Sequence, residues 1–253
     1  MKFTKLLLSA ALLMGFAACN NDGDESAQVA EGYLTFEVSA SQDVENITRA
    51  QITIDEATGG YTVPAAEDFT ITILNEEGYQ AWTGKIGEWD PIATPLKVGT
   101  YTVTAVYDNG RTGFDKPVFA SEKVAFTIVG AQETAVKIPV TLQNAIVRFT
   151  YSDMFLKYYS FDKVTVTSGT TPIEFAKGET KGAFIDATDF NIATTFTSQS
   201  GKSVAFNKDY RAQAASCYTV AFDASNIGGF GTITITLNDE VTTVDLGEIE
   251  LNE

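Results

Sequence analysis

Apolar and polar residues alternate along most of the chain from Tyr33 onward. The runs FTITI (residues 69–73), YTVTAVY (101–107) and TITITL (232–237) place an apolar residue at nearly every second position, with threonine at most positions between. This period of two is typical of β-strands that bury one face, and threonine suits the exposed face. We therefore expect an all-β protein.

Turn residues separate these predicted strands at short intervals. The pair Asn109-Gly110 is the clearest hairpin signal, because both central positions of a tight primed turn favour a positive φ. One segment, SDMFLKYY, indicates a helix of about two turns, with Ser152 as its N-cap and Asp153 in its first turn.

The two halves of the pattern resemble each other. VGTYTVTAVYDNG (98–110) and ASCYTVAFDASNIGG (215–229) both run from a Tyr-Thr-Val strand into a polar turn. The alternative is two unrelated segments that both favour tyrosine, threonine and valine. We expect two tandem antiparallel β-sandwiches, over residues 33–143 and 144–253. Because the boundary has no Pro/Gly linker, the domains should pack together or share a strand.

A short export signal is predicted at the amino terminus. Two lysines precede thirteen mostly apolar residues (6–18), whereas a membrane-spanning helix needs about 20 residues. The run ends in Ala-Ala-Cys, which resembles a bacterial lipobox. We expect a signal peptide over residues 1–18 and acylation of Cys19, which would hold the protein on a membrane. The alternative is an ordinary signal peptide followed by an incidental cysteine.

The chain after the cysteine is acidic. Residues 19–32 are polar and rich in acid, and we interpret them as a tether. The whole sequence has 17 basic and 33 acidic residues, for a net charge of −16. Loss of residues 1–18 removes two lysines and no acid, which gives −18. This charge opposes the binding of nucleic acid, because phosphates repel carboxylates.

The chain contains no histidine. This excludes Ser-His-Asp and Cys-His nucleophiles and removes the commonest metal ligand. The second cysteine, Cys217, is expected to be a small buried residue. Acidic pairs such as Asp55/Glu56 lack the spacing of a calcium loop. We expect no enzyme, metal or cofactor, although a hydrolase with two carboxylates needs no histidine and is kept as a third hypothesis.

Several motifs together are similar to one family. They are the lipobox and the segments GYLTFEV (32–38), ITRA (47–50), FTITILNEEGYQAW (69–82), PLKVGTYTVTA (95–105) and GFDKPVFASEKVAFTI (113–128). The chain resembles Bacteroidetes surface lipoproteins with domain of unknown function 4493, which have no established activity. More distantly, it resembles the fimbrillin-like adhesins of these bacteria, lipoproteins of two β-sandwiches. The resemblance implies a transthyretin-like sandwich as the alternative to an immunoglobulin-like one. Acid after Cys19 also resembles the tag that exports Bacteroidetes lipoproteins to the outside of the outer membrane.

The resemblance to fimbrillins gives the loop around Arg49 a specific meaning. In fimbrillins, an arginine-specific protease cuts such a loop and removes the first strand, and a strand of the next subunit then fills the groove. A cut between Arg49 and Ala50 would release the first predicted strand, whose core-facing residues should be Leu34, Phe36 and Val38. Self-association by strand addition would follow. The alternative is an ordinary loop arginine on a permanently anchored lipoprotein.

Four aromatic residues in or beside loops of the first half are candidate ligand-binding residues: Trp82, Trp89, Phe114 and Phe119. Exposed rings can stack on sugars, and burial under the loops is the alternative. Our leading interpretation is a non-catalytic, surface-exposed outer-membrane lipoprotein that binds a protein or glycan in adhesion, related to fimbriae. The second is a glycan-binding accessory lipoprotein of a nutrient-uptake system. An adhesin subunit should show a removable first strand, and a glycan binder should show coplanar exposed rings.

Overall fold

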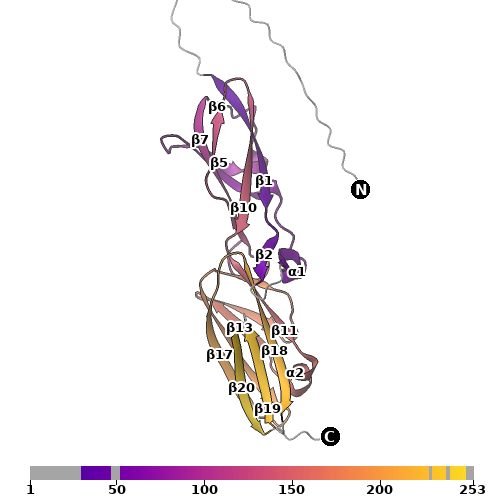
Figure 1. Ribbon diagram of the computed structural model, residues 1–253. Helices are drawn as coiled ribbons and strands as arrows, with labels where there is room; N and C mark the ends of the chain where they lie inside the picture. Colours follow the sequence, from indigo (N-terminus) through magenta and orange to yellow (C-terminus); the bar gives the residue numbers. More distant parts are fainter. Residues whose placement is uncertain (1–29, 47–51, 228–229, 238–239, 249–253) are drawn as a thin grey trace, which may run out of the picture.

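The computed structural model describes residues 30–46, 52–227, 230–237 and 240–248, and these form an elongated molecule made almost entirely of strands (Figure 1). The all-β prediction is confirmed. Two short α-helices, α1 (Ile54–Thr58) and α2 (Asp153–Tyr158), and two 3-10 turns, η1 (Ala66–Asp68) and η2 (Ile86–Glu88), accompany the strands. In the part of the chain that is described, no helix has both the length and the apolar character needed to cross a membrane.

The first half contains ten strands, of which eight form one sheet in the order β5-β4-β7-β8-β10-β1-β6, with β9 beside β7. The sheet folds back on itself, so β4 and β7 face β10 and β1 across a shared core. The strands are β1 (Glu31–Ala40), β2 (Asp43–Asn46), β3 (Ile52–Thr53), β4 (Thr70–Asn75), β5 (Gln80–Lys85), β6 (Leu96–Lys97), β7 (Gly99–Asp108), β8 (Val118–Ala120), β9 (Val124–Ile128) and β10 (Glu133–Leu142).

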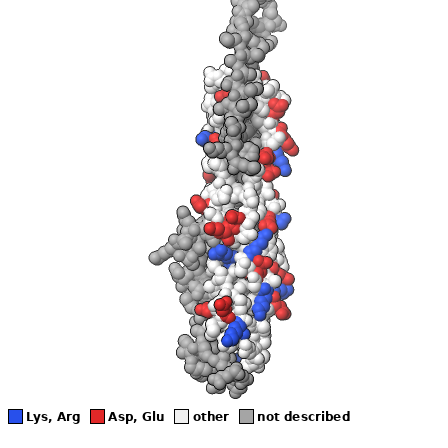
Figure 2. All heavy atoms as spheres, turned by 90° about the vertical axis from the view of Figure 1, so that its right-hand side faces the viewer, with Lys and Arg blue, Asp and Glu red and all other residues white. Residues whose placement is uncertain are grey.

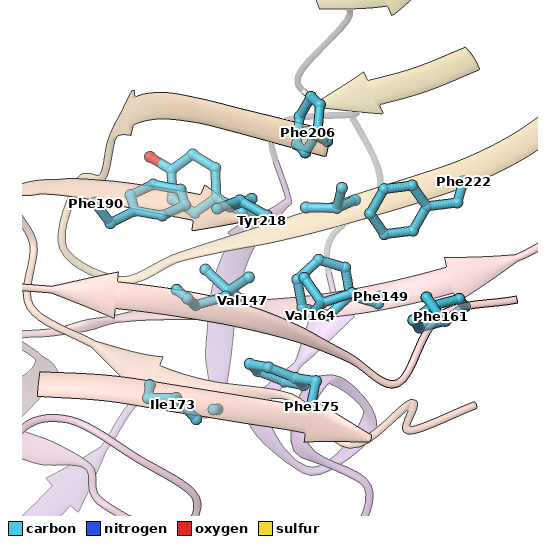
Figure 3. Packing of buried hydrophobic residues seen from close by; sticks show 14 of the residues in the cluster. Val147, Phe149, Phe161, Val164, Ile173, Phe175, Phe190, Phe206, Tyr218 and Phe222 are labelled. Carbon is cyan, nitrogen blue, oxygen red and sulfur yellow. The ribbon is translucent and has the colours of Figure 1, made fainter. Parts of the chain in front are cut away.

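The second half is a sandwich of two sheets, β15-β11-β18-β19-β20 and β12-β16-β13-β14, with β17 beside β16. Phenylalanines from both sheets meet in its core, where the Phe149 and Phe175 ring centroids lie 4.8 Å apart (Figure 3). The strands are β11 (Ala145–Tyr151), β12 (Tyr159–Ser160), β13 (Lys163–Ser168), β14 (Thr171–Ala176), β15 (Ala183–Ile185), β16 (Asp189–Ser198), β17 (Ser203–Arg211), β18 (Ser216–Ile227), β19 (Phe230–Leu237) and β20 (Glu240–Glu248).

The two halves repeat one topology. The first strand of each half, β1 or β11, pairs in parallel with a late strand, β10 or β18, and antiparallel with a short strand, β6 or β15. In each half a hairpin, β4–β5 or β13–β14, also pairs antiparallel with β7 or β16. Most other pairings are antiparallel, as expected. The two similar Tyr-Thr-Val segments lie on β7 and β18, which are not equivalent strands. By their pairing, β7 corresponds to β16 and β18 corresponds to β10.

Local sequence signals explain both α-helices. The predicted α2 is present, and the Ser152 hydroxyl accepts a hydrogen bond from the Phe155 backbone N–H at 3.1 Å. We did not predict α1, although Thr53 and Glu56 form a reciprocal capping box and Gly59 ends the helix with φ 70°. The sequence TIDEATGG therefore carried a start and a stop signal for a helix.

The predicted tight turn at Asn109-Gly110 is wrong. β7 and β8 are joined by a nine-residue loop, since Asp108 pairs with Val118. Within this loop, the Asn109 side-chain amide donates to the Asp115 carbonyl at 2.7 Å. The loop extends to the second half, where Gly113 exchanges two backbone hydrogen bonds with Phe184 at 2.9 and 3.0 Å. This contact between the halves replaces the local turn.

Candidate functional site

The first strand, β1, lies between β10 and β6 in the main sheet of the first half. Eight consecutive residues of β1, Tyr33 to Ala40, pair with β10. Leu34 is fully buried, and Phe36 and Val38 are partly buried against the same core. These are the three residues that we expected to face inward. β1 therefore contributes both backbone hydrogen bonds and apolar contacts to the first half.

The edge of β1 that faces away from β10 has few strand partners. Only Glu31 and Gly32 pair there with β6, and no described strand pairs with residues 36–40 on that side. The Trp89 indole N–H donates to the Leu34 carbonyl at 2.8 Å and so covers part of this side. A single side-chain hydrogen bond thus takes the place of a neighbouring strand at Leu34.

β2 crosses from the first half to the second. It pairs in parallel with β18, where Asn46 lies opposite Cys217, and it pairs antiparallel with β3. We call β1 and β2 together, residues 31–46, the N-terminal strap. The predicted cleavage residues, Arg49 and Ala50, lie outside the described residues, between β2 and β3 in the sequence. The strap thus runs along the first half and ends on the second (Figure 1).

The junction between the halves is tightly packed. Helix α1 contacts the segment before β15, where the Gly182 N–H donates to the Ala57 carbonyl at 3.1 Å. Ile146, Phe184 and Cys217 of the second half belong to the core cluster of the first half. Burial raises the pKa of the Cys217 thiol to about 11, which keeps the thiol neutral. Cys217 is a buried packing residue, as expected from the sequence.

Asn144 is a polar residue of this junction that the sequence did not single out. It is 2% exposed, and its side-chain amide donates to the Arg111 and Lys116 carbonyls at 2.9 Å. Its side-chain oxygen accepts from the Val118 N–H at 3.1 Å. A Gln-Asn pair between two apolar runs indicates a boundary but gives no sign that the asparagine is buried.

Two of the four candidate ligand-binding aromatics form a cluster with Phe36. The Trp82 and Trp89 ring centroids are 4.9 Å apart at 80°, and those of Phe36 and Trp89 are 5.5 Å apart at 70°. Both tryptophans are partly buried. A Cβ at Gly84 would lie 2.8 Å from the Trp82 ring, so this glycine makes room for it. The rings are nearly perpendicular and do not form the coplanar surface expected of a glycan binder.

The other two aromatics pack inward. Phe119 has no exposed surface and belongs to the first core, so its assignment as a ligand-binding residue is corrected: it lies on β8 with its side chain between the layers. Phe114 lies on the nine-residue loop and is partly buried against the second core, with its ring centroid 5.1 Å from that of Phe175. Phe114 joins the two halves.

The outer face of the second half has a shallow hollow of about 410 Å³, lined by Asp162, Lys163, Thr165, Ala193, Thr194, Thr195, Ala205, Phe206 and Asn207. Phe206 is 5% exposed, so the hollow offers polar groups without an exposed ring. Among the residues that the structure describes, no three His, Cys, Asp or Glu residues are grouped to hold a metal ion. Acidic and basic side chains are interspersed on the face in Figure 2.

Fold and strap together define a class of protein: two sandwiches of the same topology, joined tightly and spanned by the N-terminal strap. A family model described as "Domain of unknown function (DUF4493)" matches residues 30–252. The chain belongs to this family, which confirms the resemblance inferred from the sequence. The comparison with curated proteins found no match.

Several solved structures have a similar fold. A candidate cell adhesion protein from Bacteroides eggerthii is 11% identical with a TM-score of 0.50, over 89% of this chain and 98% of that chain. A candidate cell adhesion protein from Bacteroides fragilis is 9% identical with a TM-score of 0.48, over 82% and 97%. A fimbrial assembly protein from Parabacteroides distasonis is 11% identical with a TM-score of 0.42, over 85% and 98%. The similarity to the Bacteroides eggerthii protein, with its TM-score of 0.50, extends over both halves and is a similarity of fold.

Proposed function

We propose that this protein is a non-catalytic cell-surface lipoprotein that acts in adhesion and is related to fimbrial subunits. The N-terminal strap is the observation that carries the proposal, because one segment fills the edge of β10 and ends on β18. The same fold occurs in the candidate cell adhesion protein from Bacteroides eggerthii, which supports the proposal. The lack of histidine, which limits catalysis and metal binding, supports a binding role.

The anchor is Cys19, which lies outside the described residues. Acylation there would hold the strap to the outer membrane, and the acid after the cysteine favours a position outside the cell. The strap begins at the end of the first half that is farthest from the second half (Figure 1). An anchor before the strap would therefore leave the second half pointing away from the membrane, available to a protein or glycan ligand.

The proposal extends to the loop between β2 and β3. A cut between Arg49 and Ala50 would separate the strap and its lipid from the rest of the chain. Eight positions of β10 would lose their backbone partners, and the cavity left by Leu34 would expose apolar surface. Unpaired strand edges bind other strands readily, so a strand of a second copy would fill the groove.

Glycan binding is the second candidate function, and the partial exposure of Trp82 and Trp89 favours it. A Trp82→Ala variant should lose binding to glycan arrays if this ring is a contact, while a Phe114→Leu variant should retain it. The near-perpendicular rings make this function less well supported than adhesion through the strap.

Intact mass and amino-terminal sequencing test the proposal, on protein from outer membranes and from shed surface material. A chain that begins at acylated Cys19 in membranes, and a second form that begins at Ala50 in shed material, are the expected products. An Arg49→Lys variant keeps the charge and should yield only the first form. A non-acylated chain would contradict the anchor, and an Ala50 form from Arg49→Lys would contradict arginine-specific release.

A further inference from the structure

The end of the first half where β1 begins carries a small apolar patch. Tyr33, Val98 and Val129 are 45%, 47% and 45% exposed, although most large apolar residues of the described chain are buried. They come from the start of β1, the residue before β7 and the turn between β9 and β10. Together with Ala30, we call them the apolar tip. It lies at the end of the molecule remote from the second half (Figure 1).

Backbone hydrogen bonds and close packing join these segments into one surface. The Val98 N–H donates to the Ala30 carbonyl at 2.9 Å, and the Ala131 N–H donates to the Glu31 carbonyl at 2.7 Å. A Cβ at Gly130 would lie 3.0 Å from the Ala30 Cβ and 3.5 Å from a Val98 methyl group. The Tyr33 N–H also donates to the Gln132 carbonyl at 2.9 Å, so the segments that carry the tip residues lie side by side at this end.

The turn of the tip carries no charged side chain, and the strand residues beside it carry both signs. The turn over residues 129–132 has no charged side chain, whereas the sequence as a whole has a net charge of −16. Glu31 lies opposite Lys97 in the short β1–β6 pairing, and the exposed Glu133 lies opposite Tyr33 in the β1–β10 pairing. The turn itself therefore adds no electrostatic repulsion toward an anionic membrane.

The short sequence distance from Cys19 to the tip indicates which surface the tip contacts. Ala30, the first described residue, is part of the tip and follows Cys19 by eleven positions, which span at most about 40 Å. We propose that the apolar tip rests on the bilayer, with Tyr33 among the head groups and Val98 and Val129 against the upper acyl chains. This inference rests on the proposed anchoring through Cys19.

The chemistry of these side chains suits a bilayer surface. Tyrosine is enriched where membranes meet water, because its ring is apolar and its hydroxyl is polar. Three partly exposed side chains bury too little area to bind a membrane alone, but an acyl anchor makes the contact intramolecular and so effective. The contact would hold the molecule upright and present its second half to the surroundings.

An environment-sensitive fluorophore tests the contact in the full-length protein. A Val129→Cys variant and a control Met154→Cys variant, each in a Cys217→Ala background, are purified from membranes, labelled with a nitrobenzoxadiazole probe and reconstituted into phosphatidylcholine–phosphatidylethanolamine vesicles. Met154 lies on α2 of the second half and is 42% exposed, close to the exposure of Val129. Intact mass first establishes whether the protein is acylated at Cys19.

The probe at position 129 should shift to shorter wavelength on reconstitution and be quenched by spin-labelled lipid, whereas the probe at position 154 should do neither. Acylated protein with no shift at position 129 would overturn the tip contact and leave the anchor intact. Equal shifts at both positions would also overturn it, because the molecule would lie flat. Absence of acylation would overturn the proposed anchor and the contact with it.

Discussion

Asn144 shows how much one buried side chain does in this molecule. Its amide makes three hydrogen bonds to the loop and strand of the first half, and its own carbonyl accepts from the Ala215 N–H of the second half at 3.0 Å. Buried polar groups that lose their partners cost about 1–3 kcal/mol each. This residue therefore stabilises the nine-residue loop against both halves.

An Asn144→Ala variant should lose about 2–4 kcal/mol of unfolding free energy, because it leaves one N–H and two carbonyl groups without partners. Urea-induced unfolding followed by circular dichroism measures the loss. The neighbouring Gln143 is exposed, so a Gln143→Ala control should change stability by less than about 0.5 kcal/mol. Equal effects of the two substitutions would contradict the role assigned to Asn144.

Cys217 should make the stability depend on alkaline pH. Burial raises its pKa from 9 to about 11 in the folded protein, so the folded state holds its proton more tightly than the unfolded state. The stabilisation is complete below pH 9 and is lost as the pH rises through 11. The urea concentration at the unfolding midpoint should therefore decrease as the pH is raised from 8 to 10.5. This decrease should be smaller in a Cys217→Ala variant. An identical fall in both proteins would contradict this.

At the scale of elements, helix α1 is held so closely to the second half that a methyl group does not fit between them. A Cβ at Gly182 would lie 2.3 Å from the Ala57 carbonyl oxygen. A Gly182→Ala variant should lose about 3 kcal/mol of unfolding free energy, because a backbone atom must move.

Gly178 provides the control for this substitution. It lies in the same loop with φ 81°, and a Cβ there would meet no atom within 4 Å. Gly178→Ala should therefore cost only the backbone strain, about 1 kcal/mol. Urea unfolding of both variants compares the two costs, and a smaller loss for Gly182→Ala would show that α1 is not tightly docked.

The elements that sequence could predict are those decided by neighbouring residues. Alternation located most strands, and Ser152 with Asp153 located α2. The loop after Asn109 was missed because its conformation depends on Phe184, about 70 positions away. Period-two patterns also say nothing about strand direction, so the parallel pairing of β1 with β10 was not foreseen. For the same reason, the burial of Phe119 depended on which layer covers β8.

At the scale of the whole molecule, repetition of one topology was foreseeable only in outline. Two halves of similar pattern predicted two sandwiches, but the similar Tyr-Thr-Val segments are not equivalent strands. The equivalent strands are those with the same pairing: β18, like β10, pairs in parallel with the first strand of its half. The candidate site was predictable in its inward residues, Leu34, Phe36 and Val38. That β2 continues onto the second half required the structure, because its contact with β18 lies about 170 positions away.

Because the strap contacts the second half, its release should change the packing there. β2 pairs with residues 216 and 217, and the Gln42 carbonyl accepts from the Ile54 N–H at 2.9 Å, at the start of α1. Separation of the strap at Arg49 should therefore loosen α1 and expose Cys217, which is fully buried in the intact protein. Thiol labelling thus reports on the strap from the other half of the molecule.

The experiment uses full-length protein in an Arg111→Lys, Arg211→Lys background, because both arginines have exposed side chains and offer further cleavage positions. After treatment with an arginine-specific protease, Cys217 should react with a maleimide probe much faster than in untreated protein. An additional Arg49→Lys substitution should keep the slow reaction under the same treatment. Fast labelling in that control would place the opening elsewhere. Unchanged slow labelling after a verified cut at Arg49 would show that the strap stays bound without its covalent connection.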